Sequence, residues 1–131
     1  YVLPYMEQII AGLPADVPVI NFGTGNPALL PLYSAGFAAR KQNAVVGVDW
    51  RVRLDEAWQT IGYDKAVQGN LEPLVLLADQ KTLRRRVQEV LDQAGGRAGH
   101  IFNLGHGILP PTPIAHVERM VERVRRWRNG A

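Results

Sequence analysis

Short apolar runs and helical periodicities alternate along the chain, and their order is the first indication of its fold. The apolar runs predict four strands, at residues 17–22, 44–50, 65–68 and 100–104. The helical patterns predict helices at 2–13, 28–40, 54–61 and 79–94 and a last helix from 113, with a helical turn at 73–77. A helix followed by four strand–helix units predicts an α/β fold, with a parallel sheet covered by helices on both sides.

Capping and breaking residues set the ends of these elements. Asp79 is a good N-cap for the longest helix, and Gly95 follows its last apolar position. Thr112 is expected to cap the last helix, with Pro113 at its first helical position. The pair Gly69-Asn70 is expected to form a loop after the third strand.

Units of this kind build either an open doubly wound sheet or a closed eight-stranded barrel. Four units are half of a barrel, and a half-barrel has two open strand edges that suit a free monomer poorly. The chain starts at Tyr1 and not at Met, so we expect it to begin inside a longer protein.

In both architectures, ligands bind beyond the carboxyl ends of the strands. Glycine lets the backbone approach a ligand there, and polar side chains can hold it. This rule selects four segments, at residues 23–25, 49–51, 68–70 and 103–107. Within them, the possible pocket rim consists of Gly23, Thr24, Gly25, Asp49, Gln68, Asn70, Gly105, His106 and Gly107.

His106 is the sharpest of these candidates because it lies between two glycines at a strand end. Two interpretations stay open: a side chain that donates to a carboxylate or moves a proton near neutral pH, and a loop histidine bonded to backbone. His100 begins a strand at the opposite rim and His116 lies in a helix, so neither is expected in the site.

The other rim candidates favour structural or binding roles. The Gly23-Thr24-Gly25 loop could hold an anion on its amides, but it lacks a dinucleotide or P-loop pattern, which favours a plain turn. Asp49, next to Trp50 and Arg51, could orient a ligand or hold a neighbouring loop, and an ion pair or a helix-cap role is favoured over catalysis. Gln68 and Asn70 are neutral amides, which bind but do not transfer protons.

Composition narrows the function classes. The 131 residues are 47% hydrophobic and 21% charged, which is typical of a globular domain. No membrane-spanning run or secretory signal is present, so we expect a cytoplasmic protein without a membrane partner. There is no cysteine, no His-Glu-x-x-His and no carboxylate cluster, so no metal site is expected.

The net charge of +3 does not by itself indicate a nucleic-acid partner. Acidic residues are interleaved with the basic ones on two amphipathic helices, and no aromatic residues are interleaved in the manner of a single-strand binder. Solvated helix faces are therefore favoured over a phosphate-binding stripe. The basic clusters are Lys81, Arg84, Arg85 and Arg86, and Arg119, Arg123, Arg125, Arg126 and Arg128.

Several strings resemble the uroporphyrinogen decarboxylase family. They are Val-Gly-Val-Asp-Trp-Arg-Val-Arg-Leu-Asp-Glu-Ala at 46–57, Gln-Gly-Asn-Leu-Glu-Pro at 68–73 and Asn-Leu-Gly-His-Gly-Ile-Leu-Pro at 103–110. Leu-Pro-Tyr at 3–5 and Phe-Gly-Thr-Gly at 22–25 fit the same family in the same order, while the segment 34–44 is longer and more basic than the family pattern. The resemblance implies that residues 1–131 are the C-terminal half, the last four β/α units, of a (β/α)8 TIM barrel whose N-terminal part is absent.

The resemblance also implies a function. Family members are carboxy-lyases that remove the four acetate carboxylates of uroporphyrinogen III to give coproporphyrinogen III, without a cofactor and as homodimers. Their arginine-rich segment, aspartate, tyrosine and small hydroxyl residue lie N-terminal to the stretch covered here, so no catalytic residue is implied in this chain. Only His106, in Asn-Leu-Gly-His-Gly, carries over, as a substrate-binding residue. The chain alone is therefore expected to be inactive.

Two alternatives remain. Corrinoid and methionine-type methyltransferases share the barrel but bind zinc through histidine and cysteines, and this chain has no cysteine. The other alternative is a non-catalytic fragment that is stable only with a partner half.

Overall fold

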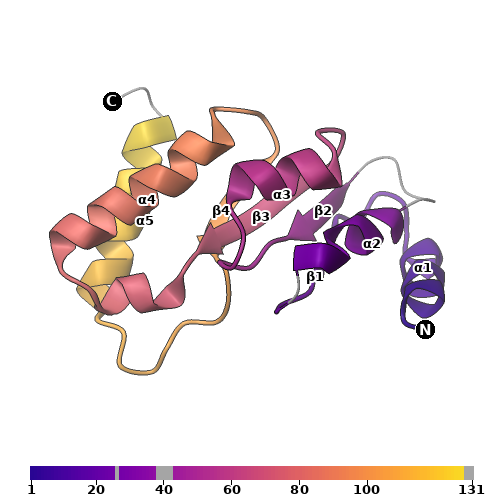
Figure 1. Cartoon of the computed structure of the whole chain (residues 1–131), viewed down its shortest axis with the longest axis horizontal. Coiled ribbons are helices and arrows are strands. Elements are labelled where there is room, and N and C mark those ends of the chain that lie inside the picture. The colour runs from indigo at the N-terminus through magenta and orange to yellow at the C-terminus, as the bar shows by residue number, and fades with distance from the viewer. Residues whose placement is uncertain (26, 38–42, 129–131) are drawn as a thin grey trace.

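A four-stranded sheet and the helices that follow its strands make up the described part of the chain, residues 1–25, 27–37 and 43–128 of a computed structural model (Figure 1). The elements are α1 (Leu3–Gly12), β1 (Val19–Phe22), the 3₁₀ helix η1 (Pro27–Leu29), α2 (Leu30–Ala35), β2 (Ala44–Gly47), α3 (Leu54–Ile61), β3 (Ala66–Leu71), the 3₁₀ helix η2 (Pro73–Leu77), α4 (Gln80–Ala94), β4 (His100–Leu104) and α5 (Ile114–Arg128). Among these residues, no helix has the length and apolar character needed to cross a membrane.

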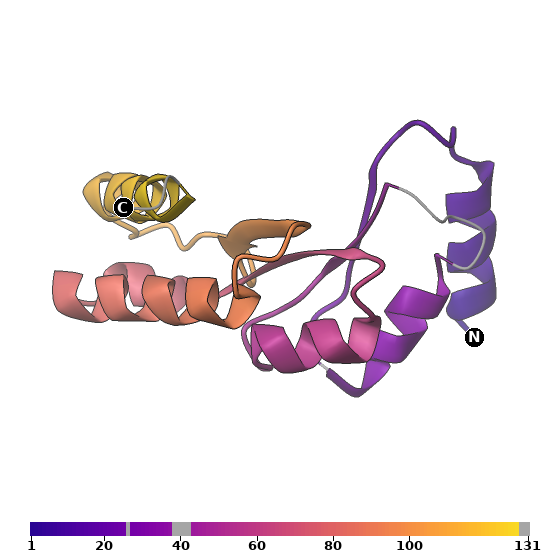
Figure 2. The same ribbon diagram turned by 90° about the horizontal axis from the view of Figure 1, so that it is seen from above.

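The strands lie in the order β1-β2-β3-β4, and each neighbouring pair is parallel, as predicted. A doubly wound sheet reverses its strand order, whereas a barrel keeps chain order and its right-handed crossovers place the helices on one face. Figure 2 shows α2, α3 and α4 together on one side of the sheet. The described sheet therefore has the order of a barrel segment, and the prediction of helices on both faces is wrong.

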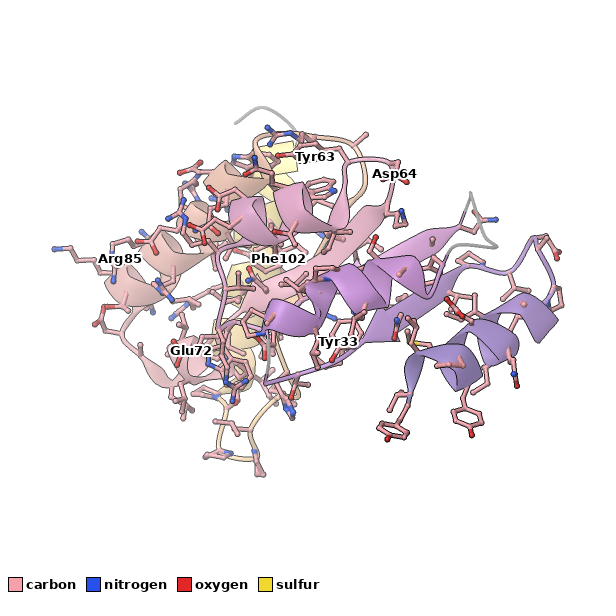
Figure 3. The ribbon with its side chains drawn as sticks, turned by 45° about the vertical axis from the view of Figure 1, so that its right-hand side comes forward. Tyr33, Tyr63, Asp64, Glu72, Arg85 and Phe102 are labelled. Atoms are coloured by element: carbon pink, nitrogen blue, oxygen red, sulfur yellow. The ribbon has the colours of Figure 1, made fainter. Side chains whose placement is uncertain are left out.

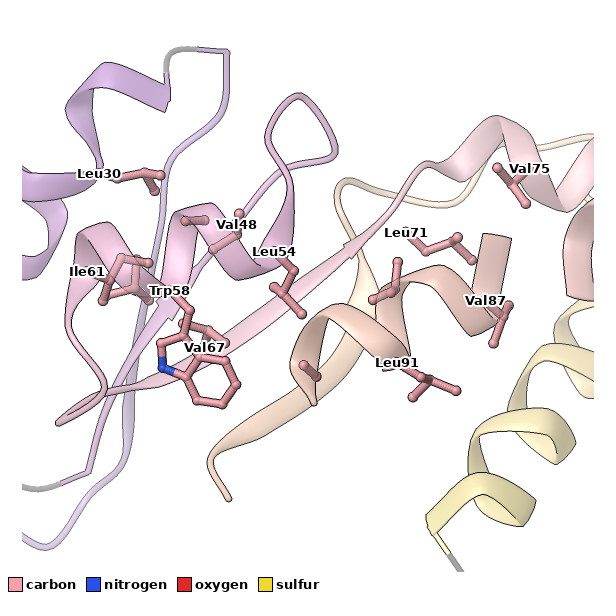
Figure 4. Close-up of a cluster of buried hydrophobic side chains, with 14 of the residues drawn as sticks. Leu30, Val48, Leu54, Trp58, Ile61, Val67, Leu71, Val75, Val87 and Leu91 are labelled. Carbon is pink, nitrogen blue, oxygen red and sulfur yellow. The ribbon is translucent and has the colours of Figure 1, made fainter. Parts of the chain in front are cut away.

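The core lies between the sheet and these helices. Val46 on β2 and Val67 on β3 are fully buried, and Trp58 on α3 is 1% exposed and packs in the same cluster (Figure 4). The Trp58 indole Nε1 also donates to the Lys65 carbonyl oxygen at 2.9 Å. Because each fully buried aliphatic side chain contributes about 1.5–3 kcal/mol, this layer provides most of the stabilisation that holds the units together.

The opposite face of the sheet is apolar and bare. Ile20 and Phe22 on β1 and Ile101 on β4 are 47%, 45% and 42% exposed. The strand register places Phe22, Gly47, Gln68 and Ile101 in one row across this face. Within the described residues, β1 and β4 each pair with one strand only, so each has a free edge.

Two strands end at positions that differ from the prediction. Gly69 and Asn70 lie inside β3, because Gly69 pairs with Phe102 and Asn70 pairs with Asn103, which continues the ladder beyond the apolar run. β2 ends at Gly47 and not at Trp50, although the Val48 N–H still donates to the Gln68 carbonyl oxygen at 2.8 Å. Cross-strand pairing, which local pattern does not contain, decides both ends.

Helix ends were predicted with mixed success. Asp79 Oδ1 accepts the Thr82 N–H at 2.9 Å, which confirms the cap of α4, and α3 has the predicted bounds. The cap predicted at Thr112 is wrong, because its buried hydroxyl has no hydrogen-bond partner among the described residues. The helix predicted to reach residue 40 ends at Ala35, and residues 38–40 lie outside the described part of the chain.

Candidate functional site

The chain turns sharply after β2 around the carboxylate of Asp49, which is only 5% exposed. Oδ1 accepts the Arg51 backbone N–H at 2.9 Å, and Oδ2 accepts the Gly25 N–H at 2.7 Å and Arg51 Nη1 at 2.8 Å. The Gly23-Thr24-Gly25 loop therefore holds an anion on a backbone amide, and that anion is the chain's own Asp49. The ion pair favoured for Asp49 is confirmed, and its bond to Gly25 shows the hold on a neighbouring loop that the sequence left possible. The helix-cap alternative is wrong for α3, because the N-cap position of that helix is Arg53.

The hydrogen bonds keep Asp49 ionised. Burial acts to raise the pKa of Asp49, but the N–H groups of Gly25 and Arg51 and the Arg51 guanidinium outweigh burial and hold the pKa below its ordinary value. A carboxylate that stays ionised and whose oxygens both accept hydrogen bonds holds its neighbours in position and is poorly suited to donate a proton.

The Arg51 side chain is held by two contacts and is otherwise exposed. Its guanidinium carbon lies 4.0 Å from the centre of the Trp50 ring, in a cation–π contact, while Nη1 bonds to Asp49. The side chain is 44% exposed, and Nε and Nη2 have no hydrogen-bond partner in the described residues. The free edge of the guanidinium is therefore oriented and available to bind an anion.

His106 joins the same cluster from the end of β4. Its ring meets the Trp50 ring edge to face, with the centroids 5.9 Å apart. We call Asp49, Trp50, Arg51 and His106 the rim cluster. It combines an oriented cation, an aromatic surface and an exposed imidazole, a combination that suits recognition of a carboxylate on an apolar body.

Gly105 makes this approach of β4 possible. A Cβ at Gly105 would lie 2.5 Å from the Trp50 backbone nitrogen and 3.0 Å from the Asp49 carbonyl carbon. The Gly105 N–H also donates to the Leu71 carbonyl oxygen at 2.7 Å. At Gly107, in contrast, a Cβ would meet nothing within 4 Å. Glycine at 105 is therefore a condition for the contact between His106 and Trp50.

The two side-chain amides of β3 differ in what they do. Asn70 is 5% exposed, and its Nδ2 donates to the carbonyl oxygens of Asp49 at 3.0 Å and Val52 at 2.6 Å. It fixes the backbone on both sides of the turn and so positions the rim cluster. Gln68 is half-buried, and its side chain makes no hydrogen bond to the described residues, which leaves it able to bind.

The three histidines have different surroundings. Nε2 of His100 lies 2.9 Å from the Gly69 carbonyl oxygen, and Nδ1 of His116 lies 2.8 Å from the Leu76 carbonyl oxygen. Burial lowers the pKa of His100, and its hydrogen bond to Gly69 opposes that shift in part. His106 is exposed and makes no hydrogen bond to the described residues. Only His106 belongs to the rim cluster.

The structure brings together most of the predicted rim residues but not all of them. Contacts join Gly25, Asp49, Asn70, Gly105 and His106, whereas Thr24 and Gly107 are exposed. Gly23 has a packing role, because a Cβ there would overlap the Tyr33 ring. No group of three or more acidic or histidine side chains in the described ranges could hold a metal ion.

Trp50 and Arg51 lie in the segment 49–51 that the strand-end rule selects, although they were not named individually as pocket-rim residues. In the sequence they stand out only as the two residues that follow a strand-end aspartate. The structure adds their contacts: Trp50 packs against His106, and Arg51 pairs with Asp49.

A four-stranded parallel sheet in chain order, with polar groups gathered at its carboxyl ends, defines an α/β protein and is consistent with part of a β/α barrel. Comparison with known sequences adds the family, since the family model described as "Uroporphyrinogen decarboxylase (URO-D)" matches residues 1–127. The chain belongs to the uroporphyrinogen decarboxylase family.

Individual relatives agree with this family. The chain is 52% identical over 126 residues to a uroporphyrinogen decarboxylase of Sorangium cellulosum, a match that covers 95% of the chain and 34% of the relative. It is 47% identical over 130 residues to the enzyme of that name from Solibacter usitatus, covering 98% of the chain and 36% of the relative. The chain thus spans about a third of the length of the curated relatives it matches.

The role of Gly105 predicts a difference between two neighbouring substitutions. Gly105→Ala should lower the free energy of unfolding by about 1–3 kcal/mol, because the new methyl group meets the Trp50 backbone. Gly107→Ala, in open space, should change it by less than about 0.5 kcal/mol. Urea unfolding of the protein at its natural length measures both, and equal values would contradict the assigned close approach.

The lowered pKa of Asp49 predicts an acid-sensitive contribution to stability. Its folded pKa lies below the unfolded value of about 3.9, so the contribution is complete above that pH and is lost as pH falls through the folded pKa. Asp49→Asn should therefore lower the free energy of unfolding by about 1–3 kcal/mol at pH 7. Below a pH of about 4, the free energy of unfolding should fall less steeply in this variant than in the wild-type protein. Unfolding midpoints measured against pH check this, and coincident curves for the two proteins would exclude it.

Proposed function

We propose that the protein carrying this chain is a uroporphyrinogen decarboxylase, a carboxy-lyase that removes the four acetate carboxylates of uroporphyrinogen III to give coproporphyrinogen III. The observation that carries this proposal is the family match over residues 1–127, together with relatives of that name at 52% and 47% identity. The fold agrees with it, because parallel β/α units in barrel order place ligand-binding residues at the strand ends.

In this proposal the chain forms the last four β/α units of a (β/α)8 barrel. The bare sheet face, with exposed Ile20, Phe22 and Ile101, is then the side that the remaining units cover. The free edges of β1 and β4 pair with the strands that close the barrel. The share of about a third of each relative supports a longer natural protein.

The rim cluster supplies the part of the substrate site that this chain contributes. Arg51 presents an oriented guanidinium to a substrate carboxylate, and His106 contacts the substrate beside Trp50. Gln68 and the backbone of the Gly23-Thr24-Gly25 loop line the same rim. Protonation of a pyrrole carbon, loss of CO2 and reprotonation of the resulting carbon fall to groups outside this chain, with no metal or organic cofactor.

The alternatives have weaker support. A thiolate-zinc methyltransferase of related fold is not favoured, since the chain has no cysteine. A non-catalytic fragment would have the same fold as the enzyme. Decarboxylase activity of the natural-length protein distinguishes the two, because only the enzyme has it.

We further propose that the whole protein acts in the cytoplasm as a homodimer on this small molecule, without a nucleic-acid or membrane partner.

The proposal predicts activity at natural length and none for residues 1–131 alone, because the groups that move protons lie outside this chain. The measurement is anaerobic conversion of uroporphyrinogen III to coproporphyrinogen III, followed by chromatography of the oxidised porphyrins. Turnover by residues 1–131 alone would contradict the assignment of catalysis to the rest of the protein. An inactive natural-length protein that is folded would contradict the proposed function.

The assigned role of Arg51 predicts a selective effect on substrate binding. Arg51→Gln removes a charge-assisted contact and should raise KM by about 10- to 100-fold with a smaller change in kcat. The matched control is Arg53→Gln, because Arg53 is two residues away and pairs with Asp55 at 2.7 Å and Glu56 at 3.4 Å on the surface. A kcat loss with unchanged KM, or equal effects in both variants, would exclude carboxylate binding by Arg51.

A further inference from the structure

A groove between α4 and α5 carries an excess of positive charge. Its volume is about 310 Å³. Four guanidinium groups line it, and a single carboxylate, that of Glu122, is present among the lining residues. We call this cavity the arginine groove, after the four arginines that line it, Arg84, Arg119, Arg123 and Arg126.

The outer face of α4 provides a contrast within the same helix. Arg85 Nη1 lies 2.5 Å from Glu89 Oε1, and Arg86 Nη1 lies 2.8 Å from Glu89 Oε2. Figure 3 shows Arg85 extending away from the molecule. These arginines are neutralised and solvated, as the sequence predicts for a helix face.

The arginine groove is not neutralised in this way. Arg84, Arg119 and Arg123 form no ion pair with the described residues, and Arg126 lies 4.0 Å from Glu122. Positions 119, 123 and 126 fall on one side of α5, so their like charges face one another across one or two turns. An anion in the groove would relieve this repulsion.

Neutral amides hold two of these guanidinium groups in place. Arg123 Nη2 donates to Gln88 Oε1 at 2.5 Å, and Arg119 lies against the side-chain amide of Gln80. Nε of Arg123 is buried without a hydrogen-bond partner in the described residues. The donors are therefore oriented and remain charged, and one buried donor lacks an acceptor, a costly state in the absence of a ligand.

We propose that the arginine groove binds a compact, multiply charged anion of the oligophosphate class. The planar fork of donors on arginine matches phosphate oxygens and binds them in pairs. None of the described residues that line the groove is aromatic, so they offer a nucleobase nothing to stack on and the charge of the ligand supplies the recognition. The groove shares no residue with the rim cluster, and the inference does not rest on the proposed function.

The test is calorimetric titration of the natural-length protein with inorganic tripolyphosphate. We expect saturable binding that weakens with added salt. The affinity should be about 10- to 100-fold weaker in Arg119→Gln and in Arg123→Gln, because each variant loses one charge-assisted contact with the anion. The matched control is Arg125→Gln, which removes the same charge from the same helix at a residue outside the groove. Its affinity should stay within about twofold of the wild-type value, because exposed charges outside the site are screened.

Other outcomes would overturn the proposal. An equal loss in Arg125→Gln would show attraction to net charge alone, and absence of saturable binding would show no site. Binding of a DNA duplex or an acidic peptide without binding of tripolyphosphate would assign the groove to a macromolecule instead. Thermal unfolding without ligand checks the fold of each variant. Arg84→Gln, on the facing helix and exposed, repeats the test if Arg123→Gln does not fold.

Discussion

The buried carboxylate of Asp49 is the interaction on which the carboxyl end of the sheet depends. It accepts hydrogen bonds from the loop after β1 and from the turn after β2, and it holds the guanidinium that Trp50 supports from one face. Asn70 on β3 holds the carbonyl groups on both sides of that turn. Gly105 then lets β4 come close enough for His106 to reach Trp50. Residues from four strand ends are thus joined around one buried charge.

The distribution of apolar surface explains how such a site fits a protein of this family. One face of the sheet is packed under α2, α3 and α4, and the other exposes large side chains such as Phe22 and Ile101. An apolar sheet face next to two free edges is stable when more of the same sheet closes over it. The relatives are about three times longer than this chain, which supports the proposal that the remaining units of a barrel cover this face.

Arginine occurs in three different environments, and the environment decides what each residue does. Arg51 is stacked on Trp50 and paired with Asp49, so its guanidinium is held in one orientation. Arg85 and Arg86 are paired with Glu89 and contribute little beyond solubility. The arginines between α4 and α5 keep their charge, since the groove offers them amides and a single carboxylate. Net charge alone would not have separated these cases.

Local sequence determined the elements whose causes are local. The bounds of α3, the cap of α4 at Asp79 and the parallel β/α order follow from periodicity, capping residues and apolar runs. Only the tertiary structure decided that β3 runs through Gly69 and Asn70 and that the helices share one face. It also decided that Asp49 binds Gly25 and that Trp50 meets His106. These contacts join residues far apart in the chain, and strand register and close packing bring them together.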